Sequence, residues 1–142
     1  MNLKAFATTA ILGVMTLIPS QAFAAQITSA RTYHSGFFQP VARVNPQLPI
    51  AIKLENETGL PLDYGVLGQS EDRVLPPAGI TEISNFSFPA NFTVYPANPS
   101  EAQLKYKVFV KDNIATVQIG QKRVGVGERS FNVNKAGAIY IY

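Results

Sequence analysis

A period-two alternation of apolar and polar residues limits what this chain can fold into. Residues 50–54 alternate in this way, and residues 62–66 do so again after an intervening segment, 56–61, that contains Asn, Gly and Pro. Successive side chains of a strand point to opposite faces, so this period is typical of half-buried strands. Asn, Gly and Pro favour chain reversal. The stretch 50–68 therefore predicts a β-hairpin.

The same alternation recurs along the chain, most clearly in residues 101–112. One face of that strand would carry Leu104, Tyr106, Val108 and Val110, and the other would carry Lys105, Lys107, Phe109 and Lys111. Shorter strands are expected at 26–34, 41–44, 73–75, 80–86, 92–95, 114–119, 130–133 and 138–142, with turns between them that include 120–123 and 134–137. An aromatic-rich core face is expected from Phe86, Phe88, Phe92 and Val94. The pattern predicts an all-β fold, an antiparallel β-sandwich of Ig-like or Greek-key type with about eight short strands.

The first 24 residues have the pattern of a cleaved signal peptide. Lys4 precedes an uncharged apolar run at 5–18, and Ala22-Phe23-Ala24 supplies the small residues of a cleavage site before Ala25. An uncleaved N-terminal anchor is the rival interpretation, although the run is short for a span of about 20 residues. We therefore expect a signal peptide at 1–24, a single β-sandwich domain at 25–142 without a further transmembrane span, and a periplasmic or extracellular location.

Composition argues against most catalytic and metal chemistry. The chain has no Cys and one His, His34, which leaves no thiol nucleophile and too few ligands for a Cys- or multi-His metal site. No cofactor and no metal are expected. Paired carboxylates could hydrolyse glycans without His, so a small hydrolase using Glu55 and Glu57 is the alternative function. A weaker idea is calcium binding, if the polar residues at turns converge at one end of the fold: Glu55, Asn56, Glu57, Glu71, Asp72, Asp112 and Asn113.

Two segments are candidate binding surfaces. Residues 101–142 hold seven Lys and Arg against three Asp and Glu, and the face formed by Lys105, Lys107, Phe109 and Lys111 would suit an anionic partner. The alternative is that these lysines protect an edge strand from pairing with other chains. The second segment is the proline-rich connection 35–49, where Phe37 and Phe38 would suit an apolar or carbohydrate partner. No nucleic acid partner is expected of an exported chain.

The residues Asn56 to Val66, with the strand before them and Val74-Leu75-Pro76-Pro77 after them, resemble a group of small exported β-sandwich proteins of cyanobacteria. The resemblance covers the middle third of the chain, and its motif is not a catalytic signature. It implies export and a β domain and no particular activity.

These observations together favour a non-enzymatic protein. We expect an exported binding, structural or accessory component of the cell envelope, whose partner is an envelope protein, a glycan or an anionic surface. Asn56, Asn85 and Asn91 each begin a glycosylation acceptor triplet, which matters only in a eukaryotic secretory pathway.

Overall fold

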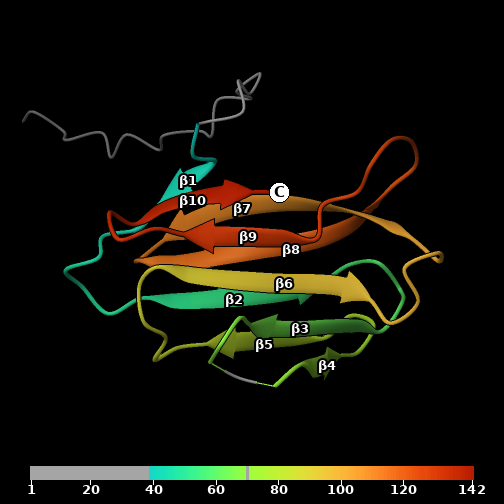
Figure 1. Ribbon diagram of the computed structural model, residues 1–142, viewed down its shortest axis with the longest axis horizontal. Coiled ribbons are helices and arrows are strands. Elements are labelled where there is room, and N and C mark those ends of the chain that lie inside the picture. Colours follow the sequence, from blue (N-terminus) through green and yellow to red (C-terminus); the bar gives the residue numbers. More distant parts are fainter. Residues whose placement is uncertain (1–38, 70) are drawn as a thin grey trace, which may run out of the picture.

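The computed structural model describes residues 39–69 and 71–142, and this part of the chain is all-β. Ten strands follow one another in the described residues (Figure 1). They are β1 (Ala42–Arg43), β2 (Ala51–Asn56), β3 (Leu62–Val66), β4 (Arg73–Leu75), β5 (Ile80–Ile83), β6 (Ala90–Pro96), β7 (Gln103–Lys111), β8 (Ile114–Lys122), β9 (Ser130–Val133) and β10 (Ala138–Ile141). Within these two ranges there is no helix long and apolar enough to cross a membrane. The all-β prediction is confirmed, and the ten strands include two very short ones, β1 and β4.

The strands form two sheets. The larger sheet has the order β1-β10-β9-β6-β3-β4, and the smaller has the order β5-β2-β8-β7. The pairings among these strands are antiparallel except for β2 with β8, which run parallel with Ala51 opposite Ile114. The prediction of an antiparallel sandwich is therefore wrong for the pairing of β2 with β8. The strand β7 lies at the edge of the smaller sheet, next to β8 only.

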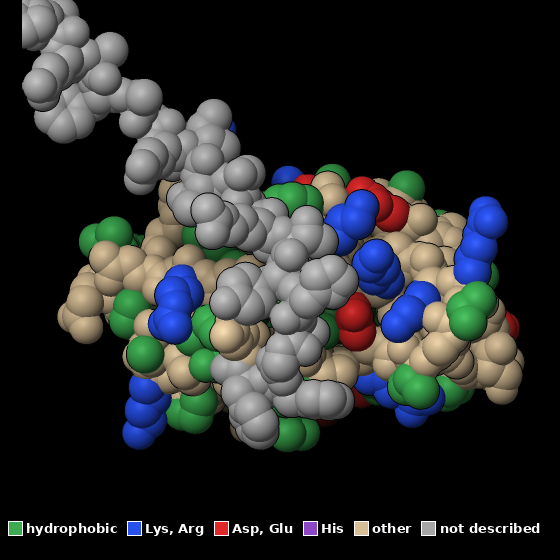
Figure 2. Space-filling view, turned by 90° about the horizontal axis from the view of Figure 1, so that it is seen from above, with side chains coloured by type: hydrophobic (Ala, Val, Ile, Leu, Met, Phe, Trp, Pro, Cys, Tyr) green, Lys and Arg blue, Asp and Glu red, His purple; other side chains and the backbone are tan. Residues whose placement is uncertain are grey.

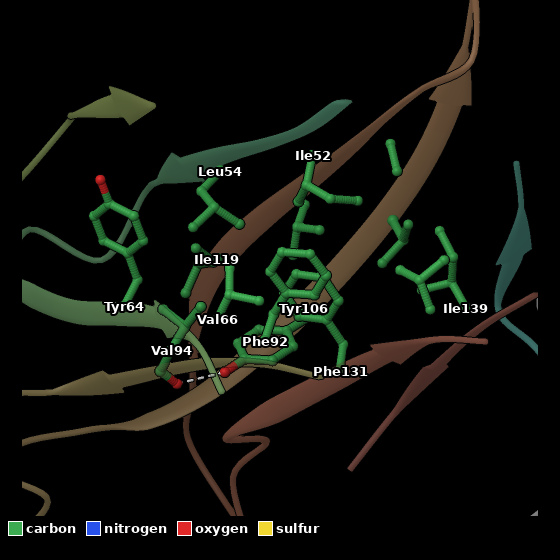
Figure 3. Packing of buried hydrophobic residues seen from close by; sticks show 14 of the residues in the cluster. Ile52, Leu54, Tyr64, Val66, Phe92, Val94, Tyr106, Ile119, Phe131 and Ile139 are labelled. Carbon is green, nitrogen blue, oxygen red and sulfur yellow. Dashed lines mark hydrogen bonds between the residues drawn. The ribbon is translucent and has the colours of Figure 1, made fainter. Parts of the chain in front are cut away.

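Alternating side chains from both sheets meet in one buried core (Figure 3). Ile52 and Leu54 of β2 are fully buried, and the residues between them face outward. The rings of Phe92 and Phe131 stack at the centre with a centroid distance of 4.7 Å, and Phe86 meets Phe92 edge to face at 5.1 Å. The predicted aromatic core face is confirmed. The Tyr106 hydroxyl donates to the Val94 carbonyl at 2.5 Å, which satisfies its one polar group among these apolar neighbours.

The predicted hairpin at 50–68 is wrong, although both of its strands exist. The strands β2 and β3 belong to different sheets, so the segment between them crosses from one sheet to the other. Asn56 is buried at this crossing, and its hydrogen bonds hold the segment in place (Figure 1 shows the course of the chain). Its side-chain amide donates to the carbonyls of Leu60, Leu75 and Pro76, and its carbonyl accepts from the backbone and hydroxyl of Thr58. Because period two is the same in a hairpin and in such a crossing, alternation alone did not distinguish them.

The hairpin formed by β7 and β8 is the longest pairing in the smaller sheet. Lys111 pairs with Ile114 across a two-residue turn, Asp112-Asn113, in which both residues have positive φ of 51° and 60°. This is the type I′ geometry that matches the twist of the flanking strands, and Asp and Asn tolerate it. Asn113 also donates to the carbonyls of Asn45 and Pro49, which fastens the turn to the connection before β2.

Most other predicted elements are found close to their expected bounds. The edge piece at 41–44 is β1, and 73–75 is β4. The expected turn at 120–123 is wrong, because β8 continues to Lys122 and the Gln121 side-chain amide donates to the Thr58 carbonyl at 2.7 Å. The expected strand at 26–34, the signal peptide at 1–24, Phe37 and Phe38 lie outside the described residues.

Candidate functional site

The outer face of the smaller sheet carries the predicted lysines side by side. Lys105, Lys107, Phe109 and Lys111 of β7 are all exposed, while Leu104, Tyr106 and Val108 are buried on the other side of the strand. Alternate residues of an antiparallel strand are about 7 Å apart, so Lys105 and Lys107 are adjacent and Lys111 lies roughly 20 Å from Lys105. We call the face formed by Lys105, Lys107, Phe109 and Lys111 the lysine face. The sequence prediction of this face is confirmed in its geometry.

The strand β8 offers the lysine face no charged partner. Across the β7–β8 pairing, Lys105 lies opposite Gly120, Lys107 opposite Gln118 and Phe109 opposite Thr116, none of which is charged. Within the described residues, the one ion pair joins Lys53 to Glu55 on β2, with Nζ and Oε1 2.8 Å apart. Because the Debye length is about 8 Å in physiological salt, Lys105 and Lys107 are close enough to act on one bound charge together, whereas Lys111 contacts a separate part of an extended anion.

Glu55 lies on the same outer face, one strand beyond β8. The Lys53 ammonium and then the Gln118 amide, which donates to Oε2 at 3.1 Å, lower the pKa of Glu55 below its ordinary value. A glycosidase acid needs a raised pKa and a second carboxylate facing it. Glu57 follows the end of β2 and is exposed, and neither Glu57 nor Glu55 lines either of the two surface cavities that flank the core. The geometry of these two acids gives no support to the hydrolase alternative.

Two surface cavities flank the core. One, of about 300 Å³, opens between β6 and β7. It is mostly apolar and is lined by Tyr95, Pro96, Pro99, Ala102, Leu104, Glu128 and Arg129 among others. The second, of about 320 Å³, is more polar and is lined by Tyr64, Arg73, Glu82 and Asn85 among others. Each contains a single carboxylate, Glu128 in the first and Glu82 in the second, so neither presents the pair that glycan hydrolysis requires.

The turn residues suggested for calcium do not converge. Asn56 ends β2 next to Ile119, whereas Asn113 precedes β8 at the opposite end of the same parallel pair. Asn56 is also fully engaged with backbone groups. In the two described ranges there is no cluster of three or more His, Asp or Glu side chains that could hold a metal ion. The predicted convergence is wrong because it assumed that the turns meet at one end.

The edge of β7 is partly covered, which bears on the role of its lysines. The segment after β8 runs along this edge, where the Glu128 amide donates to the Leu104 carbonyl at 2.9 Å and the Glu128 carboxylate accepts from the Tyr106 amide. The rest of the edge, toward Lys111, has charged side chains on its exposed face. Both the edge-protection and the anion-binding interpretations therefore remain compatible with the position of these lysines.

Sequence reasoning missed the loop between β8 and β9, residues 123–129. Val124 and Val126 are the most exposed large apolar side chains in the described residues, at 82% and 86%. They follow Lys122 and Arg123 directly and precede Arg129. Figure 2 looks onto the molecule from above, and most of its Lys and Arg side chains lie in the right half, which is also where this loop projects in Figure 1. The sequence signal that could have indicated this exposed loop is a pair of valines separated by Gly and flanked by basic residues.

Comparison with protein-family models, with curated proteins and with solved structures yields no match. The surfaces described above are therefore interpreted from their geometry and chemistry.

Proposed function

We propose that this chain is an exported, non-enzymatic binding protein of the cell envelope that contacts an anionic partner through its lysine face. The observation that carries the proposal is the row of exposed ammonium groups on β7, which form no ion pair with any residue that the structure describes and have uncharged residues opposite them on β8. The fold that presents them would be a β-sandwich of Greek-key type. Export rests on the signal-peptide pattern of residues 1–24.

The chemistry of the face fits an extended anionic surface better than a small molecule. The lysines are spread over roughly 20 Å of one strand, and neither of the two cavities described above is lined by them. Phe109 is 48% exposed between Lys107 and Lys111 and adds an apolar contact. Attraction between the lysine ammonium groups and the negative charges of a partner raises the rate of association, and this attraction weakens as salt is added. A partner held by this face should therefore dissociate at high ionic strength.

The test is binding to dextran sulfate, a soluble anionic polymer, measured by calorimetry over a range of salt. The variant Lys105→Gln/Lys107→Gln/Lys111→Gln should weaken binding at least tenfold at low salt. The matched control is Arg43→Gln/Arg73→Gln/Lys135→Gln, which removes the same charge from exposed positions of the larger sheet and its turns. The control should retain most of the affinity. Equal loss in both variants would show that only net charge matters and would contradict a dedicated face.

Two further outcomes separate the alternatives. Binding of the wild type that survives about 0.5 M salt would point to Phe37 and Phe38 in place of the lysines. A lysine-face variant that binds as well as the wild type but forms oligomers would assign these lysines to edge protection. Export is tested separately by N-terminal sequencing of the protein recovered from the envelope fraction, which should begin at Ala25.

A further inference from the structure

The loop between β8 and β9 presents two apolar side chains to solvent on a fixed base. Gly127 donates its amide to the Gln103 side chain at 2.8 Å, and the Glu128 amide bonds to Leu104. A Cβ at Gly127 would lie 2.7 Å from the Leu104 nitrogen, so the backbone is in close contact with β7 at this point. On the other side of the tip, Lys122 Nζ donates to the Val126 carbonyl at 3.1 Å. The two exposed valines therefore lie on a loop that hydrogen bonds hold in place on both sides.

Basic residues surround this apolar tip. Lys122 and Arg123 precede it, and Arg129 follows it and is exposed. Lys105 of the lysine face lies opposite Gly120, two residues before Lys122, so the end of that face nearest the loop continues the positive charge. The one acid in the loop, Glu128, is bound to the Tyr106 amide on the edge of β7. The loop thus combines an uncharged tip with a cationic base.

A single exposed valine on a protein surface needs no explanation. Here, however, the two most exposed large apolar residues of the described part of the chain share one projecting loop, and cations lie on both sides of them. This arrangement is complementary to the surface of an anionic bilayer, where apolar side chains enter the boundary between headgroups and acyl chains while Lys and Arg contact phosphates. A soluble anionic polymer would use the cations but would offer nothing to the valines.

We propose that this loop docks on a lipid bilayer that contains anionic headgroups, with Val124 and Val126 inserted and with Lys122, Arg123 and Arg129 on the phosphates. The inference rests on the proposed function and makes it specific, because the bilayer becomes the anionic partner of the Lys105 end of the lysine face. Only the end of that face near Lys105 would meet a bilayer that receives the loop tip, since Lys111 lies at the far end of β7.

The chain contains no Trp, so a single introduced one reports on the tip alone. The variant Val126→Trp, in protein purified after export, should show a blue shift of its emission with vesicles of phosphatidylcholine and roughly 30% phosphatidylglycerol. Quenching by brominated acyl chains would place the side chain within the bilayer. The control Val74→Trp, at an exposed position on β4, should show neither effect. An unshifted emission at Val126 in vesicle-bound protein would overturn the insertion.

Vesicle affinity provides the second readout. Val124→Ser/Val126→Ser should bind anionic vesicles about 30-fold more weakly than the wild type and should bind dextran sulfate equally well. Val41→Ser/Val74→Ser, which alters exposed valines elsewhere, should leave both affinities unchanged.

The possible failures are distinguishable. If the wild type binds dextran sulfate through its lysine face but does not bind anionic vesicles, the lipid inference is wrong and the proposed function stands. If the loop variant binds vesicles like the wild type, the valines have no part in docking. If the wild type is a dimer in solution and Val124→Ser/Val126→Ser makes it monomeric, the tip contacts a second copy of the chain and the lipid inference is again wrong.

Discussion

Replacing Asn56 by Ala should destabilise the fold more than any substitution of a surface polar residue. Asn56 is 2% exposed and joins the crossing between the sheets to the turn after β4. Its loss removes the donor to the buried Leu75 carbonyl and the acceptor for the Thr58 amide, and it weakens the contacts of two further carbonyls. A buried polar group left without a partner costs about 1–3 kcal/mol.

The Leu75 carbonyl and the Thr58 amide each lose a partner, and the two further carbonyls become partly hydrated. Together these changes lower the free energy of unfolding by about 3–4 kcal/mol, which is large for a single substitution. For a domain of this size the melting temperature should fall by roughly 10–15 °C. Thermal and urea unfolding followed by circular dichroism measure both quantities, and the absence of Cys removes disulfide exchange as a complication. The control is Asn91→Ala, at a sequon residue that is exposed and whose side chain accepts one bond from Asn132. It should cost less than about 1 kcal/mol.

Asn56→Asp sharpens the test because it keeps the shape and the acceptor for Thr58. The introduced carboxylate would face three carbonyl oxygens with no proton to donate, so its folded-state pKa should be raised above the ordinary value of about 3.9. The destabilisation should then be small below that value, grow as the pH rises toward the raised pKa, and be constant above it. If Asn56→Ala melts within about 2 °C of the wild type, Asn56 does not hold the crossing and this reasoning is wrong.

The remaining stability predictions concern backbone positions. Gly137 has a φ of 76°, and a Cβ there would collide with the Val44 carbonyl, so Gly137→Ala should cost about 3 kcal/mol in urea unfolding. Gly68→Ala, which has the same φ but open space around it, should cost only about 1 kcal/mol; equal losses would show that the close approach to Val44 is unimportant. Ala78 occupies the second central position of the turn 76–79 with a φ of 56°, where Gly is preferred. Ala78→Gly should therefore raise stability by about 0.5 kcal/mol, and a lower melting temperature would contradict this.

The sequence predicted local structure well where alternation was strong. In β7 every second residue from Leu104 to Val108 is buried, and the four residues proposed as a binding face are exposed. The turn at 134–137 was also predictable, since its Asn134 and Gly137 are the residues that such a turn requires; Asn134 Oδ1 accepts from the amides of Ala136 and Ala138.

Pairing between distant strands could not be predicted in the same way. The strand β2 pairs with β5 on one side and, on the other, with β8, which comes about sixty residues later and runs parallel to it. No feature of residues 51–56 specifies that partner, because the buried face of β2 would fit any neighbouring strand of matching parity. The crossing at Asn56 was missed for a related reason, since Asn in a turn usually indicates local reversal and here its side chain binds carbonyls about twenty residues away.

The candidate site likewise has one part that the sequence predicted and one part that it did not. The lysine face is a property of one strand and was predictable. The loop of Val124 and Val126 has no periodicity, and its conformation depends on bonds to Gln103 and Leu104 of another strand. Its exposure became apparent only in the folded chain.

The most direct test of the central claim is to locate the anion-binding surface by NMR. Titration of ¹⁵N-labelled protein with dextran sulfate at low salt should shift the amide resonances of Lys105, Lys107, Phe109 and Lys111 most, together with their partners on β8, and the shifts should disappear as salt is added. Shifts that centre on Arg43, Arg73 or Lys135 of the larger sheet, or that are spread evenly over both sheets, would contradict the assignment of function to the lysine face.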